Sequence, residues 1–162
     1  WLFRYDRGSD YHRLVHAVKY RSNRELGVWA GRMLGERMGN ADGIDRVIPV
    51  PLHPKRERER GFNQAFLIGT GIAEVLGVRL ESDRLKRVVN TPSQTGLERE
   101  RRAGNVADAF RLENVEGLEG CHVLLVDDVI TSGATVRACM AELCKIRGIR
   151  VSVACLGKSG GI

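Results

Sequence analysis

Apolar residues recur along the chain in two patterns. Short apolar runs bounded by glycine, proline or polar residues predict β-strands, and apolar residues spaced three or four apart predict helices. The strands predicted in this way are 1–7, 46–50, 78–80, 85–89, 109–112, 122–126 and 150–156. Ser9 or Asp10 can cap a first predicted helix, which ends near 20–23. Three further helices are predicted at 25–38, 62–76 and 133–146. Strands that alternate with helices predict an α/β fold whose mainly parallel central sheet is flanked by helices.

Length and composition fit a globular domain with an anionic partner. The 162 residues suit a single compact domain, 1–162. The formal net charge of +6 favours nucleic acid or phosphorylated small molecules as partners. No apolar stretch approaches the roughly 20 residues that cross a bilayer and the start shows no secretory pattern, so we expect no membrane span. The four cysteines contain no C-x-x-C pair, which argues against a zinc ribbon here and favours reduced, buried thiols.

The segment V-L-L-V-D-D-V-I-T-S-G-A-T, from Val123 to Thr135, carries the most chemical information. It places Asp127 and Asp128 at the carboxyl end of a buried strand, where ligands of open α/β sheets bind. The turn that opens the next helix consists of Thr131, Ser132, Gly133, Ala134 and Thr135. Its backbone N–H groups and hydroxyls favour a phosphate monoester, and two neighbouring carboxylates suit a ribose diol or the waters of a magnesium ion. Phosphate and diol together predict a site for a 5-phosphoribosyl group.

Each half of this segment also has a simpler interpretation. Paired aspartates after a strand occur in response regulators and in Walker B sites, and a turn of small hydroxyl residues is most often only a helix cap. The chain has no G-x-x-x-x-G-K-[ST] sequence, which argues against a nucleoside triphosphatase. The joint pattern of strand, D-D and T-S-G-A-T resembles the motif with which type I phosphoribosyltransferases bind 5-phosphoribosyl-1-pyrophosphate (PRPP).

A PRPP site also needs a pocket for pyrophosphate. Prolines and basic residues follow the strand at 46–50 in the string P-L-H-P-K-R-E-R-E-R. The candidates for pyrophosphate binding there are Leu52, His53, Lys55, Arg56 and Arg60. The alternative is a solvated helix start in which Glu57 and Glu59 pair with the basic residues, because charged runs usually lie on surfaces. His53, beside two prolines, is explained equally well as a structural residue.

A connection of about twenty residues, 90–108, joins two strands that we expect to pair. Connections of this length in a small domain are often functional. Its position resembles the flexible hood loop of the phosphoribosyltransferase superfamily. We therefore expect a lid that closes over the substrate and brings Arg99 and Arg102 to the pyrophosphate. The alternatives are a charged helix with Glu98–Arg102 pairing and a disordered basic segment.

Several strings resemble one family more closely than the superfamily. The most specific are V-D-D-V-I-T-S-G-A-T at 126–135 and R-G-F-N-Q at 60–64. The latter lies within I-P-V-P-L-H-P-K-R-E-R-E-R-G-F-N-Q-A at 48–65. With H-A-V-K-Y near Lys19, T-P-S-Q-T-G-L at 91–97 and R-R-A-G-N-V-A-D-A-F at 101–110, the chain is similar to the ComF-type competence proteins from about Phe3 to Leu156. The similarity also touches the phosphoribosyltransferase half of glutamine amidophosphoribosyltransferases.

The resemblance implies a type I phosphoribosyltransferase fold, a cytoplasmic bacterial protein and a link to natural transformation or DNA uptake. ComF-type proteins often carry an N-terminal four-cysteine zinc ribbon, which these 162 residues lack. The chain begins at Trp1, so a preceding segment is an open alternative. The partners expected are PRPP and an unidentified acceptor. DNA, the competence machinery and a second copy of the chain in a homodimer are further candidates.

The reaction expected is a magnesium-dependent displacement of pyrophosphate from PRPP by a nitrogen nucleophile. Asp127 and Asp128 would hold the ribose hydroxyls, and magnesium would bind mainly through PRPP. These two residues and Arg99 are the catalytic candidates, and no general base is identified. Two alternatives stay open, a non-catalytic PRPP-binding regulator and a DNA-binding accessory protein whose basic runs follow a phosphate backbone.

Overall fold

The computed structural model describes residues 3–4, 24–39, 43–89 and 108–158. In chain order its elements are β1 (Phe3–Arg4), α2 (Arg24–Met38), β2 (Arg46–Pro49), α3 (Pro54–Arg60), α4 (Gln64–Leu76), β3 (Arg79–Leu80), β4 (Leu85–Arg87), β5 (Phe110–Leu112), β6 (His122–Ile130), α6 (Ala134–Leu143) and β7 (Arg150–Lys158). The helix predicted after Ser9 and most of the predicted lid lie outside the described residues. Within those residues, no helix combines the length and apolar character needed to span a bilayer.

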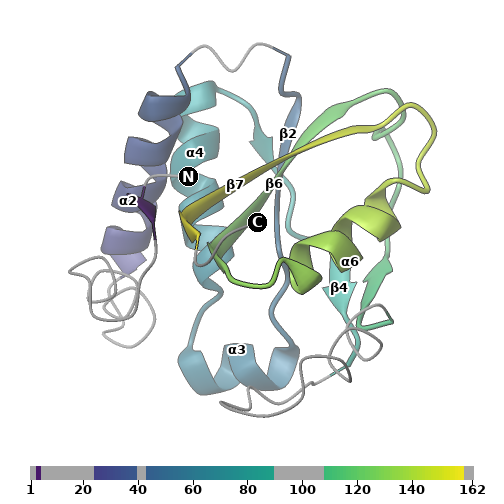
Figure 1. Cartoon of the computed structure of the whole chain (residues 1–162), viewed down its shortest axis with the longest axis horizontal. Helices are drawn as coiled ribbons and strands as arrows, with labels where there is room; N and C mark the ends of the chain where they lie inside the picture. Colours follow the sequence, from purple (N-terminus) through teal and green to yellow (C-terminus); the bar gives the residue numbers. More distant parts are fainter. Residues whose placement is uncertain (1–2, 5–23, 40–42, 90–107, 159–162) are drawn as a thin grey trace.

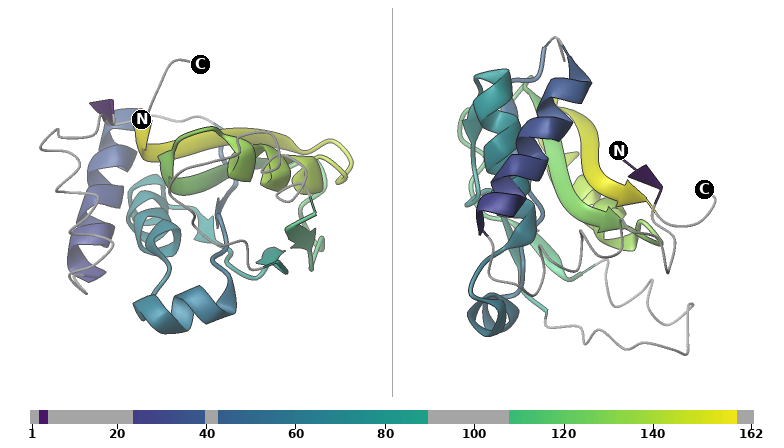
Figure 2. Two further views of the ribbon diagram at one scale, coloured as in Figure 1. Left: turned by 60° about the horizontal axis from the view of Figure 1, so that its bottom comes forward. Right: turned by 90° about the vertical axis from the view of Figure 1, so that its left-hand side faces the viewer.

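A five-stranded parallel sheet forms the centre of the molecule, in the order β1-β7-β6-β2-β3. Helices α2 and α4 lie on one side of it, and α6 lies on the other side with the antiparallel hairpin β4–β5 (Figures 1 and 2). The α/β class and the parallel sheet predicted from the sequence are therefore confirmed.

Strand β6 shows why the central strands are continuous apolar runs. Val123 and Leu125 belong to the core beneath α6, whereas Leu124 and Val126 belong to the core beneath α2 and α4. Successive side chains of a strand point to opposite faces, so a strand that is covered on both sides needs apolar residues at every position. All four of these side chains are buried to 1% exposure or less, and they fix the strand at the middle of the sheet.

The strand runs further than its apolar residues predicted. The apolar run that predicted 122–126 stops at Asp127, yet β6 continues to Ile130 because β7 runs alongside it to Lys158. Asp127 pairs with Cys155 in this ladder. The two aspartates therefore lie within a hydrogen-bonded strand rather than in a loop after it.

Helices α2 and α4 pack with their backbones in contact. A β-carbon added at Gly31 would lie 2.1 Å from the backbone oxygen of Ile68, a distance that no real side chain occupies. Gly27 and Gly35 lie one turn to either side on α2 and face Leu67 and Val75 at 2.8 Å and 3.0 Å from such an added carbon. Glycine permits this close approach because it has no β-carbon. The contact holds α4 firmly beside the sheet.

Strand β2 ends where its neighbour on one side has already ended. Proline has no N–H group and is tolerated in a sheet only where no partner needs one. Pro49 satisfies this condition because β3 pairs only with Arg46 and Val47. The next residue, Val50, still donates to the backbone oxygen of Val126 at 2.8 Å, after which the chain leaves the sheet toward α3.

Candidate active site

A cavity of about 270 Å³ opens at the carboxyl ends of β2 and β6. This edge is where open α/β sheets bind their ligands. The charged side chains that line the cavity are Arg56, Arg60, Arg87, Asp127 and Asp128. The sequence predicted all of them as site residues except Arg87. The structure thus places both predicted carboxylates and two of the predicted basic residues around one space.

Asp127 and Asp128 are each oriented by the residue that follows. The backbone N–H of Asp128 donates to Oδ1 of Asp127 at 2.9 Å, and the N–H of Val129 donates to Oδ1 of Asp128 at 2.6 Å. A carboxylate can accept about four hydrogen bonds, so these backbone bonds do not by themselves fill either group. Both side chains are half-buried, and both line the cavity.

The turn after β6 forms a small hollow of about 30 Å³ beside the cavity, lined by residues 129–136 without a gap and by Asp127. Gly133 adopts a left-handed φ of 72° and precedes the first residue of α6, where a residue with a β-carbon would cost roughly 1–2 kcal/mol. Gly133 has no side chain to cap this helix, and Oγ of Ser132 accepts the N–H of Ala134 at 3.4 Å, so the other backbone N–H groups of the first turn suit an anion. Thr135 lines both the hollow and the cavity, which places the predicted phosphate turn directly next to the aspartates.

The basic segment forms a short helix, α3, and two of its arginines reach the cavity. Arg56 and Arg60 line the cavity, and Nη1 of Arg60 donates to Oε1 of Gln64 at 3.2 Å. The alternative prediction, a solvated helix start, agrees with the structure in that the segment is a helix without a buried residue. A helix without a buried residue therefore still contributes two arginines to the lining of the cavity.

Leu52, His53 and Lys55 were predicted for the same pyrophosphate pocket, and the structure separates them. Leu52 lines the cavity and also a neighbouring hollow of about 620 Å³. His53 lines only that neighbouring hollow, and its Nδ1 accepts the backbone N–H of Lys55 at 3.2 Å as the N-cap of α3. The side chain of Lys55 is exposed and does not line the cavity.

The R-G-F-N-Q string forms the joint between α3 and α4. Gly61 ends α3 with a left-handed φ of 81°, and Asn63 caps α4 by accepting the N–H of Ala65 at 3.0 Å. The Nδ2 group of Asn63 also donates to the backbone oxygen of Val50 at 3.0 Å. The string therefore ties the start of α4 to the end of β2, and so fixes one wall of the cavity.

Arg87 is the charged residue of the site that the sequence prediction missed. It lies on β4, where its guanidinium stacks 5.4 Å from the ring centroid of Phe110. Burial lowers the pKa of Arg87, and the nearby positive charges of Arg56 and Arg60 lower it further. Side chains two apart share a strand face, so the position of Arg87 two residues after the buried Leu85 was a usable signal for an inward-facing charge.

The predicted lid residues Arg99 and Arg102 lie outside the described residues. The strands that flank the predicted lid, β4 and β5, pair as predicted, with Arg87 opposite Phe110. The N–H of Val88 donates to the backbone oxygen of Ala109 at 2.8 Å and extends this pairing. Because Arg87 lines the cavity, the connection from β4 to β5 begins and ends beside it.

The donors at this edge fit magnesium better than zinc. No group of three or more His, Cys, Asp or Glu side chains gathers within the described part of the chain. Magnesium is commonly held by one or two carboxylates together with the phosphates of a substrate, a role that Asp127 and Asp128 fit. Cys139 lies close by on α6, but burial and then the charge of Asp127 raise the pKa of its thiol, so it is unsuited to act as a thiolate.

Comparison with known protein families agrees with this geometry. A family model described as a phosphoribosyl transferase domain matches residues 63–160. The chain belongs to this phosphoribosyl transferase family. The matched range contains the R-G-F-N-Q joint only from Asn63 onward, but it includes both aspartates and the whole phosphate turn.

Curated relatives confirm the resemblance to ComF-type proteins. The chain is 34% identical over 149 residues to the DNA utilization protein YhgH of Salmonella typhi, an alignment that covers 88% of the chain and 65% of that relative. It is 38% identical over 93 residues to competence protein F of Haemophilus influenzae, covering 57% of the chain and 41% of that protein. The chain thus spans less than two thirds of the length of either relative.

Solved structures of two phosphoribosyl-handling enzymes share the fold. Adenine phosphoribosyltransferase from Thermoanaerobacter pseudethanolicus superposes with a TM-score of 0.56 at 21% identity, covering 86% of the chain and 71% of that enzyme. Glutamine PRPP amidotransferase from B. subtilis gives 0.58 at 20% identity, covering 88% of the chain and 30% of that enzyme. The type I phosphoribosyltransferase fold predicted from the sequence is confirmed.

Proposed function

We propose that this chain binds PRPP with magnesium and transfers its phosphoribosyl group to a nitrogen acceptor, releasing pyrophosphate. The observation that carries the proposal is the charge distribution around one cavity. Two carboxylates of β6 line it together with three arginines, Arg56, Arg60 and Arg87, and the glycine-containing turn before α6 adjoins it. Few ligands other than a doubly phosphorylated sugar need all three features at once.

Each part of PRPP has a proposed place. The 5-phosphate would accept hydrogen bonds from the turn at 131–135, and the ribose hydroxyls would donate to Asp127 and Asp128. The pyrophosphate would lie against the arginines of α3 and β4, with Arg99 and Arg102 approaching from the connecting segment. Bound magnesium would neutralise part of the pyrophosphate charge.

Catalysis in such a site would come mainly from positioning and from stabilising the leaving group. The bond from C1 of the ribose to pyrophosphate breaks, and the bond from C1 to the acceptor nitrogen forms. Arginines fixed near the pyrophosphate stabilise the charge that develops on it as it leaves. The described lining of the cavity contains no histidine, so we assign the acceptor proton to no side chain.

The test has two steps. Calorimetry with PRPP and MgCl₂ measures binding, and a coupled pyrophosphate assay with a panel of nucleobases and amines measures turnover. Saturable PRPP binding and acceptor-dependent pyrophosphate release are the expected results. Binding without release from any acceptor would instead support the non-catalytic regulator, and absence of PRPP binding would refute the proposal.

A role in handling DNA is the second candidate. The relatives named for DNA utilization and competence support it, as does the net charge of +6. Binding to a phosphate backbone releases counterions, so the affinity for labelled DNA would fall steeply between about 50 and 200 mM salt. Failure to bind single- or double-stranded DNA at low salt would remove this candidate without affecting the PRPP site.

A further inference from the structure

The side chain of Gln64 is buried beside the cavity, and the NH₂ group of its amide has no hydrogen-bond partner. Gln64 opens α4 and is only 3% exposed, yet it lines the cavity. Its Oε1 accepts from Nη1 of Arg60 at 3.2 Å. Its Nε2 makes no hydrogen bond. A buried donor without an acceptor is costly, so native proteins keep few of them, and those they keep often lie at sites of function.

The orientation of this amide is determined by Arg60. A guanidinium only donates, so the amide oxygen and not the NH₂ group must face it. Turning the amide over would bring two donors together and lose the bond at 3.2 Å. Arg60 therefore holds Gln64 with its NH₂ group directed away from the arginine.

The surroundings show which kind of group would satisfy Nε2. Arg56, Arg60 and Arg87 line the same cavity and are donors, as Nε2 is. The carboxylates of Asp127 and Asp128 also line the cavity, but neither accepts from Nε2. Nε2 is covered in this structure, so a ligand's acceptor oxygen would satisfy it once the Gln64 side chain rotates toward the cavity, and the neighbouring guanidinium groups favour an anionic oxygen.

We propose that Gln64 is a binding residue for the diphosphate group of PRPP, and that Arg60 positions it. This inference rests on the proposed function, because it names the part of PRPP that Gln64 contacts. The diphosphate is favoured over the 5-phosphate by location: the phosphate hollow is lined by residues 129–136 and Asp127 and does not include Gln64. A neutral donor adds a hydrogen bond here without adding a fourth positive charge to the arginines.

The experiment compares two ligands on one variant. Gln64→Glu keeps the shape and the acceptor for Arg60 but replaces the NH₂ donor with an anionic oxygen. Calorimetry with magnesium pyrophosphate and, separately, with ribose 5-phosphate would be run on the wild type and on this variant. We expect the affinity for pyrophosphate to fall at least about tenfold, since a buried donor is replaced by a repelling acceptor, and the affinity for ribose 5-phosphate to stay within about twofold.

Two further variants make the result unambiguous. Thr70→Glu adds the same charge on α4 at a residue that does not line the cavity, and it should leave both affinities unchanged. Gln64→Met removes the amide without adding charge. It replaces Gln64→Glu in both titrations if that variant shows no cooperative unfolding and is therefore not folded. Its expected loss for pyrophosphate is about threefold to tenfold.

Three outcomes would overturn the inference. Wild-type affinity for pyrophosphate in both Gln64 variants would show that Nε2 contacts no diphosphate. Equal losses for pyrophosphate and ribose 5-phosphate would show that Gln64 only supports the shape of the site. If the wild type binds neither ligand nor PRPP, the proposed function fails and this inference fails with it, so the two failures are told apart by the wild-type titrations.

Discussion

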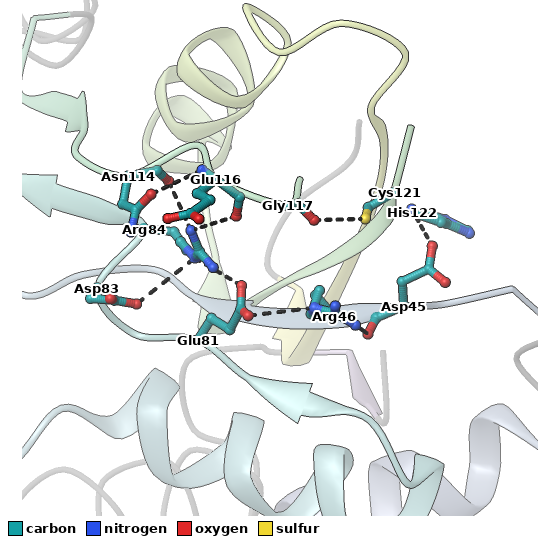
Figure 3. A network of polar contacts seen from close by, with 10 residues as sticks. All are labelled: Asp45, Arg46, Glu81, Asp83, Arg84, Asn114, Glu116, Gly117, Cys121 and His122. Carbon is teal, nitrogen blue, oxygen red and sulfur yellow. Dashed lines mark hydrogen bonds and ion pairs between the residues drawn. The ribbon is translucent and has the colours of Figure 1, made fainter. Parts of the chain in front are cut away.

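Two groups of partly buried arginines lie at different parts of the sheet, and their neighbours differ. Near the amino ends of β2 and β6, Arg84 lies 2.8 Å from Glu81 and donates to the backbone oxygen of Glu116 at 3.0 Å (Figure 3). Glu81 is shared with Arg46 at 3.4 Å. At the carboxyl ends of the same strands, burial lowers the pKa of Arg87, the like charges of Arg56 and Arg60 lower it further, and Asp127 acts in the opposite direction.

The difference separates structural charge from functional charge. A buried arginine that meets a carboxylate and carbonyl oxygens stabilises the fold around it. Arginines gathered around an open cavity repel one another until an anion binds between them, so they weaken the fold and strengthen binding. The same residue type should therefore respond to mutation in opposite ways at the two edges.

The largest effect is expected at the amino edge. Arg84→Met leaves Glu81 with only Arg46 and removes the partner of two backbone oxygens, those of Asn114 and Glu116. Both side chains of the Arg84–Glu81 pair are 13% exposed, so we expect a loss of about 3 kcal/mol in the free energy of unfolding, measured in urea. PRPP affinity should stay within about twofold of the wild type.

Arg87→Met should give the opposite result. Removing the charge relieves its repulsion with Arg56 and Arg60 but also removes its attraction to Asp127 and its contact with the Phe110 ring, so the free energy of unfolding should change less than in Arg84→Met. The loss of charge-assisted hydrogen bonds should weaken PRPP binding by about 2 kcal/mol, roughly thirtyfold, in calorimetry. A variant that unfolds as readily as Arg84→Met and binds PRPP normally would remove the distinction between the two edges.

The smallest effect concerns the buried thiol of Cys139 beside the cavity. Burial and Asp127 raise its folded-state pKa above the unfolded value of about 8.5, so its contribution to stability is complete below that pH and is lost as the pH rises above it. We expect the free energy of unfolding of the wild type to fall between pH 8.5 and 9.5 by about 1 kcal/mol more than that of Cys139→Ala.

The exposed Cys144 provides the control for this pH dependence. Cys144→Ala should keep the wild-type slope, because it removes an exposed thiol and leaves the buried Cys139 in place. Parallel slopes for the wild type and Cys139→Ala would show that Cys139 is not held in its protonated form by the fold.

Sequence periodicity predicted the buried parts of the fold well. The apolar run at 122–126 predicted a buried strand, and the structure places Val123–Val126 between the two cores. Periodicity did not predict that the strand continues to Ile130. That extension depends on the length of the neighbouring strand β7, which the residues of β6 alone do not determine. The backbone contact at Gly31 was likewise missed, since its cause is the position of Ile68 on another helix.

Sequence analysis found the site residues that local sequence identifies and missed those that tertiary packing brings to the cavity. Asp127 and Asp128 could be found because they follow directly on the apolar run Val123–Val126. Gln64 and Arg87 could not be assigned to it, since they reach the cavity only when α4 and the β4–β5 hairpin have folded against the sheet. His53, beside the site in sequence, caps α3 and lines the neighbouring hollow instead.

The aspartates test the central claim most directly. Asp127→Asn and Asp128→Asn keep the size of the side chains and an oxygen for the backbone N–H groups, but remove the negative charge from the cavity. Asp83→Asn, at a carboxylate that is 74% exposed, is the matched control. Calorimetry with PRPP and magnesium should show at least about a hundredfold loss for each cavity variant and none for the control. Wild-type affinity in Asp127→Asn and Asp128→Asn would contradict the account.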